Sequence, residues 1–233
     1  MTNKWLVGIT TAPRKRVTFS DSLTSLLKAG WRHEEIVVAA EPGSVVCDDS
    51  GLSQIIYNRT KLGVFANWRM LLNEVAKHMQ EVDVIALVQD DMQYATGLKK
   101  YLEETMRDDP AIYSPYTSRK DAFHAKPTQP GWFRSVLGWD MCGACTYVMR
   151  PEMVSILNNQ FVESTKLNKN VDAHVGSFMR RKGRPIFIHN PSLVEHVADD
   201  NSTLGYGKDP FTRTAFNFSP VSPTIPPTTT VEL

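Results

Sequence analysis

Residues 84–91 read Val-Ile-Ala-Leu-Val-Gln-Asp-Asp: five apolar residues followed directly by an amide and two carboxylic acids. An apolar run of this length, bounded by charge, is typical of a strand buried on both faces of a parallel sheet. In open parallel sheets, ligands bind at the carboxyl ends of the strands. The stretch therefore predicts an α/β fold, and it also predicts the edge of the sheet at which a binding site is expected.

The segments around this strand alternate between strand and helix patterns. Short apolar runs predict strands over residues 5–10, 36–40, 55–57, 111–115, 143–149 and 185–189. Amphipathic segments predict helices over residues 19–29, 65–79, 98–106, 151–157 and 172–182. Residues 117–138 are rich in polar and turn residues and predict a long functional loop. The order predicts a mostly parallel, Rossmann-like sheet flanked by helices.

The composition is that of an ordinary globular protein. The 233 residues carry 26 Lys and Arg against 25 Asp and Glu, a net charge of +1, and 42% of them are hydrophobic. These values exclude an acidic disordered tail, a coiled coil, a collagen and a wholly basic nucleic-acid binder, although they leave room for a local basic patch. The length allows one large domain or two small ones.

Cysteine usage and hydropathy indicate the compartment. Three cysteines are an odd number, which argues against a secreted disulfide scaffold and for a reducing environment. Cys142 and Cys145 form a CxxC, but no second CxxC or ligand-spaced histidine pair accompanies it, so we interpret both as structural. There is no run of 18 apolar residues and no signal-peptide pattern at the N-terminus. We therefore expect a cytoplasmic protein, in the host cytoplasm if the protein is viral.

Asp90 and Asp91 are the sharpest chemical feature. Burying two adjacent carboxylates costs several kcal/mol unless something neutralises them. Mg²⁺ or Mn²⁺ would do so and could also hold a diphosphate. On the local pattern alone, a helix N-cap followed by one exposed acid explains the two residues equally well.

Four segments in the same order resemble the nucleotide-sugar glycosyltransferases of the GT-A fold. They are VGITTAPR at 7–14, NRTKLGVFANW at 58–68, QDD at 89–91, and PSLVEHV at 191–197 followed by STLG at 202–205. The third segment stands where the family places its acidic DxD or EDD metal motif, from which Gln89 departs. The resemblance covers residues 4–207.

This resemblance implies a single GT-A-like domain over residues 1–216. Its nucleotide-binding half would span about residues 1–110 and its acceptor half about 111–216. Residues 217–233 hold four Pro and four Thr. They predict an extended or disordered tail, or an arm that packs on a partner.

The resemblance also implies roles for individual residues. The donor, a nucleotide-sugar with UDP favoured, would be bound by Thr10, Thr11, Arg14, Glu41, Asn67, Gln89 and Asp90. Asp91 would be the principal ligand of Mn²⁺ or Mg²⁺, and His196 would be the second ligand. A packed or surface histidine is the alternative for His196. The neutral amide of Gln89 would remove one carboxylate contact and weaken the metal site.

Transfer with inversion needs a carboxylate that takes the proton of the acceptor. Asp172, at the start of the helix predicted over 172–182, is the first candidate, and Asp140 is the reserve. A helix cap is the alternative for Asp172, and a retaining enzyme would need neither residue in this role. Trp132, Phe133 and Trp139 would shape the acceptor site, unless they fill the core.

The acceptor and the reaction class stay open at this point. Basic residues at 14–16, 99–100 and 180–184 could track a phosphate backbone, although a solvated helix face explains such runs as well. Small soluble enzymes of this type occur in bacteriophages, where some modify hydroxymethylated bases in DNA. The acceptor would be such a base or a saccharide. One alternative is a nucleotidyltransferase, but that class needs a Gly-rich loop with a lysine after the first strand, and residues 11–14 do not supply it. The other alternative is an inactive nucleotide-sugar binding module, which Gln89 favours.

Overall fold

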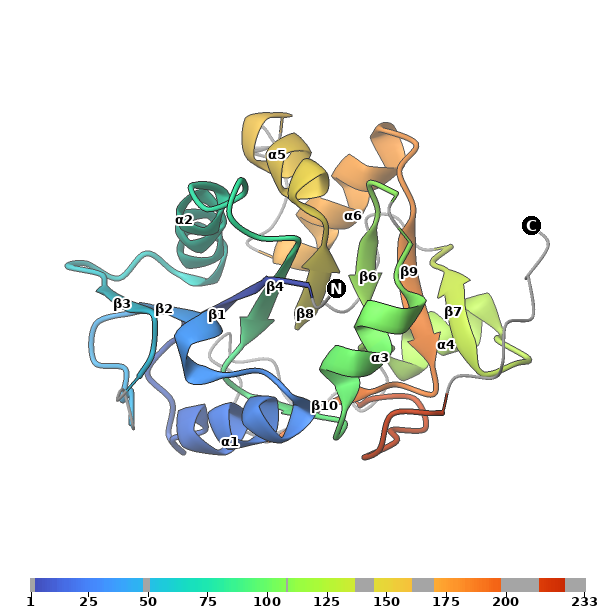
Figure 1. Ribbon diagram of the computed structural model, residues 1–233, viewed down its shortest axis with the longest axis horizontal. Helices are drawn as coiled ribbons and strands as arrows, with labels where there is room; N and C mark the ends of the chain where they lie inside the picture. The colour runs from blue at the N-terminus through green and yellow to red at the C-terminus, as the bar shows by residue number, and fades with distance from the viewer. Residues whose placement is uncertain are drawn as a thin grey trace.

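A computed structural model describes residues 3–47, 51–107, 109–136, 145–160, 170–197 and 214–224. Within these residues, eight strands form one sheet in the order β3-β2-β1-β4-β8-β6-β9-β7 (Figure 1). The strands are β1 (Trp5–Thr11), β2 (Ile36–Ala40), β3 (Gln54–Tyr57), β4 (Val84–Gln89), β6 (Ile112–Ser114), β7 (Gly131–Arg134), β8 (Thr146–Met149) and β9 (Ile186–Asn190). Strands β1 to β4 are mutually parallel and β9 is parallel to β6, whereas β8 and β7 are antiparallel to their neighbours. The prediction of an α/β fold with a mostly parallel sheet is confirmed.

Helices cover both faces of the sheet (Figure 1). Helices α1 (Phe19–Ala29) and α3 (Leu98–Thr105) pack on one face, and α2 (Val64–Ala76), α5 (Pro151–Gln160) and α6 (Val171–Arg181) pack on the other. The side chains of β1 alternate between these two cores, with Val7 on the α1 side and Leu6 on the α2 side. Gly8 permits close packing of α2, because a Cβ atom there would lie 3.0 Å from the side chain of Leu71.

The carbonyls at the ends of α1 and α5 are satisfied in two different ways. Gly30 ends α1 in a left-handed conformation with φ of 113°, and its N–H donates to the carbonyls of Leu26 and Leu27. At the far end of α5, the guanidinium of Arg69 donates to the carbonyls of Leu157 and Asn158 at 3.1 and 2.7 Å. The arginine on α2 thereby satisfies carbonyls that the last turn of α5 leaves unpaired.

The prediction of a long loop over residues 117–138 is wrong for residues 117–136, the part of this segment that the structure describes. Helix α4 (Arg119–Ala125) begins there, because Ser118 and Asp121 form a capping box. Strand β7 follows and pairs with β9 at the edge of the sheet. The polar composition of the segment reflects a short surface helix and an edge strand rather than irregular structure.

A second, two-stranded sheet positions part of the candidate site. Strands β5 (Met92–Tyr94) and β10 (Val194–His196) pair antiparallel, and His196 lies opposite Met92. Neither strand was expected from the sequence. Since Met92 follows the two acids directly, this pairing fixes His196 beside them.

Residues 214–224 pack on the α1 and α3 side of the sheet, where Ala215 is buried in the core. The N–H of Thr96 donates to Pro220 at 2.9 Å, and the N–H of Ser222 donates to Thr96 at 3.2 Å. Phe218 packs against the same core as α1 and α3. The rest of the predicted tail, residues 225–233, lies outside the described residues.

Candidate functional site

The polar residues that end β1 and β4 lie together at the carboxyl edge of the sheet. The two strands are parallel neighbours, with Thr10 in register with Gln89. The N–H of Asp90 donates to the carbonyl of Thr10 at 3.2 Å, which continues the ladder past the end of β4. The sequence positions Thr10, Thr11, Gln89, Asp90 and Asp91 are therefore spatial neighbours.

Arg14 bridges both carboxylates. Its Nη2 and Nε atoms lie 2.7 and 3.0 Å from Oδ1 of Asp90, and its Nη1 atom lies 2.9 Å from Oδ2 of Asp91. The Arg14 side chain is 8% exposed and each aspartate side chain is 3% exposed. Thr11 donates its hydroxyl to Oδ2 of Asp90, so both oxygens of that residue are bound within the protein.

Burial and charge act in opposite directions in this group. Burial lowers the pKa of Arg14, but the charges of Asp91 and Asp90 outweigh burial, and the pKa of Arg14 is raised overall. Burial also raises the pKa of Asp90, against the opposing effect of the Arg14 charge. Arg14 is therefore a permanent positive charge held next to two buried acids.

His196 stands beside this cluster. Its Nδ1 atom lies 3.8 Å from Oδ2 of Asp91, and its side chain is 7% exposed. The N–H of Val197 donates to the carbonyl of Asp91 at 2.8 Å, which holds β10 against the acids. On the other side of the ring, Nε2 lies 3.4 Å from Sγ of Cys145. Apart from the CxxC that contains Cys145, nothing in the sequence indicates that this cysteine contacts His196. The other cysteine of the CxxC, Cys142, lies outside the described residues.

Two side chains could hold a divalent cation here. Nδ1 of His196 is buried and has no hydrogen-bond partner among the described residues. An imidazole nitrogen without a partner, facing a carboxylate, matches the nitrogen and oxygen ligands that Mn²⁺ accepts. No group of three His, Cys, Asp or Glu side chains within the described residues is arranged around one metal position. The residues therefore fit a cation that takes its remaining ligands from water or phosphate oxygens.

Glu41 and Asn67 tie α2 to the ends of the strands. The buried carboxylate of Glu41 accepts the N–H groups of Leu62 and Gly63, at 2.9 and 2.7 Å, where α2 begins. The Nδ2 atom of Asn67 donates to the carbonyl of Ala39 at 3.2 Å and to that of Thr11 at 3.5 Å. Both residues lie at the expected edge of the sheet. Glu41 fixes the loop before α2, and Asn67, besides its bonds to the strand ends, accepts from Nδ2 of Asn58 in that loop at 2.8 Å.

No protein-family model and no curated protein sequence matches the chain. Solved structures match instead. GalNAc-T7 in complex with UDP, GalNAc and Mn²⁺ superposes with a TM-score of 0.55 at 12% identity, over 84% of this chain and 43% of that chain. S. aureus TarS superposes with a TM-score of 0.51 at 12% identity, over 84% of this chain and 37% of that chain. Both are GT-A glycosyltransferases. The fold is GT-A-like.

The chain spans less than half the length of these two proteins, 43% and 37% respectively. A197 from STIV aligns over 95% of this chain and 98% of that chain, with 10% identity and a TM-score of 0.49. The GT-A-like fold is shared with the two glycosyltransferases TarS and GalNAc-T7.

Asp172 lies at the same edge of the GT-A-like sheet as the acids. It is in the first turn of α6, and α6 leads into β9, which runs in the same direction as β4. In that turn, the ring of His174 lies 4.6 Å from Phe65, at the start of α2. Oδ1 of Asp172 accepts the N–H of Ala173 at 3.1 Å. The reserve candidate, Asp140, lies outside the described residues.

The expected acceptor aromatics are placed differently. The ring of Trp132 lies 5.1 Å from Tyr113 and 4.9 Å from His189, and its Nε1 atom donates to Thr105 at 3.0 Å. Phe133 packs against the opposite core. Both residues are partly buried and pack against the two cores, because β7 alternates its side chains between the two faces of the sheet. Trp139 lies outside the described residues.

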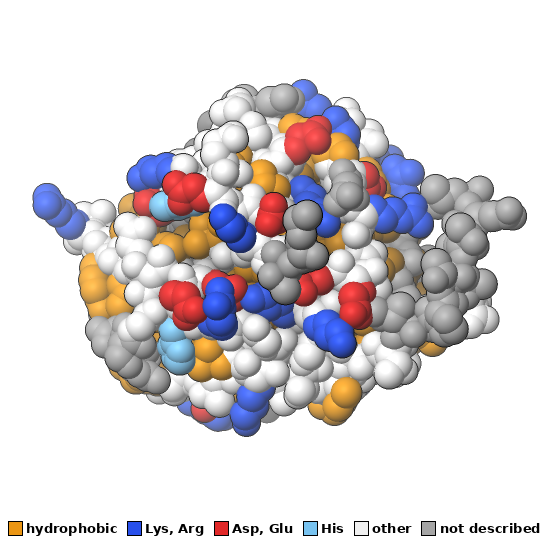
Figure 2. Space-filling view, in the orientation of Figure 1, with side chains coloured by type: hydrophobic (Ala, Val, Ile, Leu, Met, Phe, Trp, Pro, Cys, Tyr) orange, Lys and Arg blue, Asp and Glu red, His pale blue; other side chains and the backbone are white. Residues whose placement is uncertain are grey.

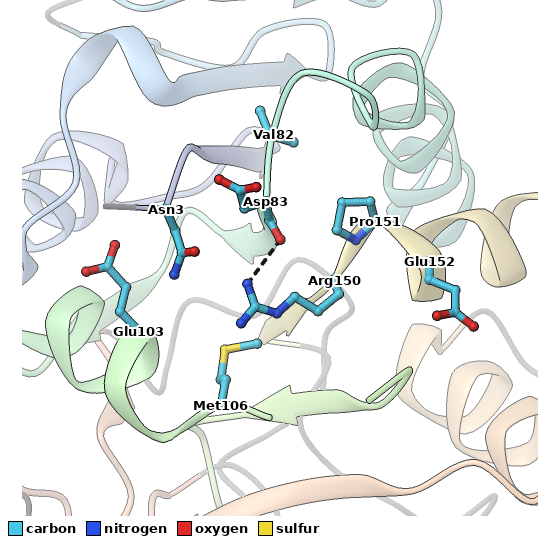
Figure 3. Close-up of a pocket in the computed structure, with 8 residues that line it drawn as sticks. All are labelled: Asn3, Val82, Asp83, Glu103, Met106, Arg150, Pro151 and Glu152. Carbon is cyan, nitrogen blue, oxygen red and sulfur yellow. Dashed lines mark hydrogen bonds between the residues drawn. The ribbon is translucent and has the colours of Figure 1, made fainter. Parts of the chain in front are cut away.

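A pocket lies at the other edge of the sheet, away from the acids. A pocket of about 690 Å³ is lined by Asn3, Val82, Asp83, Glu103, Met106, Arg150, Pro151 and Glu152 (Figure 3). These residues surround the amino ends of β1 and β4. A cavity of about 30 Å³, lined in part by Thr11, Arg14 and Asp90, adjoins the candidate site. The polar strand ends, and not the larger pocket, carry the candidate chemistry.

The predicted basic clusters are partly engaged with acids. Nζ of Lys99 lies 2.8 Å from Oε1 of Glu35, and their side chains are only 14% and 6% exposed. Arg14 is bound to Asp90 and Asp91. On the face shown in Figure 2, basic and acidic side chains are interspersed. Lys99 and Arg14 are therefore not part of an open surface for a phosphate backbone.

Within the described residues, no helix is long and apolar enough to cross a membrane.

Proposed function

We propose that the chain is a glycosyltransferase that moves a sugar from a nucleotide-sugar donor, a UDP-sugar first of all, to a hydroxyl acceptor. The observation that carries this proposal is the grouping of Arg14, Asp90, Asp91 and His196 at the carboxyl edge of a GT-A-like sheet. GalNAc-T7, which shares the fold, was crystallised with UDP, GalNAc and Mn²⁺, and this supports a donor and a metal of the same kinds here.

The donor would lie over the ends of β1, β2 and β4. Thr10, Thr11 and Gln89 line the ends of β1 and β4, and Glu41 and Asn67 shape the loop before α2. Asp91 and His196 would hold Mn²⁺ or Mg²⁺. When bound, the cation supplies positive charge that balances the diphosphate leaving group.

Asp172 would act as the general base of an inverting transfer. The acceptor oxygen attacks the anomeric carbon of the sugar and forms the new glycosidic bond. The bond from that carbon to the diphosphate oxygen breaks, and its electron pair leaves with the nucleoside diphosphate. The acceptor proton passes to the Asp172 carboxylate. The half-buried position of Asp172 at this edge of the sheet supports the assignment.

The acceptor would be a saccharide or a hydroxymethylated base in DNA. The exposed basic residues Lys15, Lys100, Arg180 and Arg181 support the second alternative. Since Lys99 and Arg14 are engaged elsewhere, this support rests on fewer charges than the sequence alone indicates.

A donor and acceptor screen tests the proposal. Purified protein with Mn²⁺ is incubated with UDP- and GDP-sugars, alone and with oligosaccharides or hydroxymethylated DNA, and products are followed by mass spectrometry. The proposal predicts release of nucleoside diphosphate from at least one donor, and a loss of about 100-fold or more in Asp91→Asn. Asp21→Asn, an acid about half exposed outside the site, serves as the matched control.

The other outcomes are distinct. Consumption of a nucleoside triphosphate together with a sugar phosphate would identify a nucleotidyltransferase. UDP binding without turnover of any donor would identify a binding module. Full turnover by Asp91→Asn would show that the metal site is elsewhere.

A further inference from the structure

Two buried carboxylates side by side need positive charge, and in this structure Arg14 supplies it. The guanidinium contacts Asp90 through two nitrogen atoms and Asp91 through a third, at 2.7, 3.0 and 2.9 Å. A planar fork that spans two carboxylates is a geometry that arginine provides and lysine does not. The acid pair is therefore already neutralised, in part, by a residue of the same chain.

The site offered to a divalent cation overlaps this ion pair. The oxygen of Asp91 that faces His196 Nδ1 at 3.8 Å is Oδ2, and the same oxygen lies 2.9 Å from Nη1 of Arg14. A cation between Asp91 and His196 would lie close to the guanidinium. Two positive charges at such a separation repel strongly in a buried site, because little water screens them.

We infer that Arg14 is the resident counter-cation of Asp90 and Asp91, and that a divalent cation binds Asp91 in competition with it. This inference builds on the metal site of the proposed function, but it concerns the protein before any nucleotide binds. Free protein therefore binds Mn²⁺ weakly, although it carries two buried acids and an available imidazole nitrogen.

The competition also connects the cation to the donor. When a cation takes Asp91, the contact of Nη1 of Arg14 with Oδ2 of Asp91 is weakened, and a guanidinium fork is well suited to phosphate oxygens. Cation and nucleoside diphosphate then favour each other's binding, and the coupling is equal in both directions. Arg14 would thus hold the acids in the free protein and the diphosphate in the loaded one.

The test measures binding of Mn²⁺ alone by electron paramagnetic resonance, with no nucleotide present. Arg14→Gln is expected to bind Mn²⁺ at least tenfold more tightly than the wild type. Arg16→Gln is the matched control, because Arg16 is an exposed arginine two residues away that pairs with Asp21 and not with the buried acids. It is expected to behave as the wild type. The double variant Arg14→Gln with Asp91→Asn is expected to lose the gain.

Removal of Arg14 also takes away the positive charge that neutralises the acids, and this loss can unfold the protein. In that case Mn²⁺ is expected to restore folding of Arg14→Gln, seen by circular dichroism and as a rise in Tm larger than that of the wild type. A folded Arg14→Gln variant with unchanged or weaker Mn²⁺ affinity would overturn the inference. So would an unfolded variant that Mn²⁺ does not rescue.

The failure of this inference and the failure of the proposed function can be told apart. If the wild type binds no nucleotide but Arg14→Gln gains Mn²⁺ affinity, the function fails and the inference stands. If sugar transfer is found but Arg14→Gln shows no gain, the inference fails and the function stands.

Discussion

Nε2 of His196 lies 3.4 Å from Sγ of Cys145, whereas the other ring nitrogen of the same histidine faces Asp91. Histidine ligands of metals are commonly fixed by a partner on the nitrogen that does not bind the metal. Cys145, which is 8% exposed at the start of β8, is in the position of that partner. The contact with Cys145, which directly precedes β8 in the middle of the sheet, thus orients the ring of His196, a candidate metal ligand.

Replacing this thiol tests its role as a positioning residue. Cys145→Val keeps the size of the side chain but removes the contact to Nε2, and we expect a loss of about tenfold in Mn²⁺ affinity with UDP present. Cys145→Ser keeps a hydrogen-bonding group and is expected to stay within a few fold of the wild type. Calorimetry measures both. Equal affinities for the wild type and Cys145→Val would show that the contact is only packing.

Glu41 is expected to act on stability through the start of α2. Glu41→Gln replaces a carboxylate that accepts two backbone N–H groups, and the free energy of unfolding is expected to fall by about 1–2 kcal/mol. Urea denaturation provides the measurement. Glu34→Gln, in which an acid with a 62% exposed side chain is changed, is the control and is expected to stay within about 0.5 kcal/mol. Equal stabilities of the two variants would contradict the account of this loop.

His189 predicts a pH dependence of stability. The residue is buried, it accepts from Tyr101 at Nε2 and it donates to Pro191 from Nδ1, both at 2.7 Å. Burial lowers the pKa of His189 from 6.5 to about 4. Between pH 6.5 and about pH 4, His189 therefore binds a proton in the unfolded chain but not in the folded chain. The free energy of unfolding consequently falls as the pH drops through this range.

The expected loss from His189 is about 2 kcal/mol between pH 7.5 and pH 4.5. Urea unfolding of the wild type and of His189→Gln over this range isolates the effect, because other titrating groups are common to both proteins. The wild type should lose more stability than the variant on acidification. Parallel pH profiles would contradict the assignment.

The N-cap of α6 is Asn170, so the expected alternative of a helix cap at Asp172 is not what the structure has; Asp172 lies in the first turn, where Oδ1 accepts the N–H of Ala173. Asp172 can be a base or have only this structural role, and asparagine separates the two, because its side-chain oxygen can still accept an N–H but does not accept the acceptor proton. For Asp172→Asn we expect turnover to fall by about 10²–10⁴-fold, with UDP affinity and Tm unchanged. Unchanged turnover would leave Asp172 with a structural role in the first turn of α6.

The elements that could be predicted are those with strong local signals. The helix over 19–29 ends at Gly30 and the strand over 36–40 is apolar throughout, and the structure has both with the expected bounds. Strands β5 and β10 have three residues each, and their pairing depends on contacts between distant parts of the chain. Helix α4 could not be predicted, because it is short and mostly polar and therefore shows no hydrophobic periodicity.

The candidate site could be predicted as a set of positions but not as a set of contacts. Asp90 and Asp91 were identifiable because they end a buried strand, and His196 because its segment resembles that of a family. The structure brings these residues together. The bridge from Arg14 to both acids and the contact of Cys145 with His196 depend on side-chain geometry, which the spacing of residues along the chain does not encode.

Titration of UDP into the protein by calorimetry, in saturating Mn²⁺ and again in a metal chelator, tests the central claim most directly. The account predicts that the wild type binds UDP, that Mn²⁺ strengthens binding, and that Asp91→Asn loses the effect of Mn²⁺ while Asp21→Asn keeps it. Absence of binding of UDP and of other nucleoside diphosphates, both with and without Mn²⁺, would contradict it.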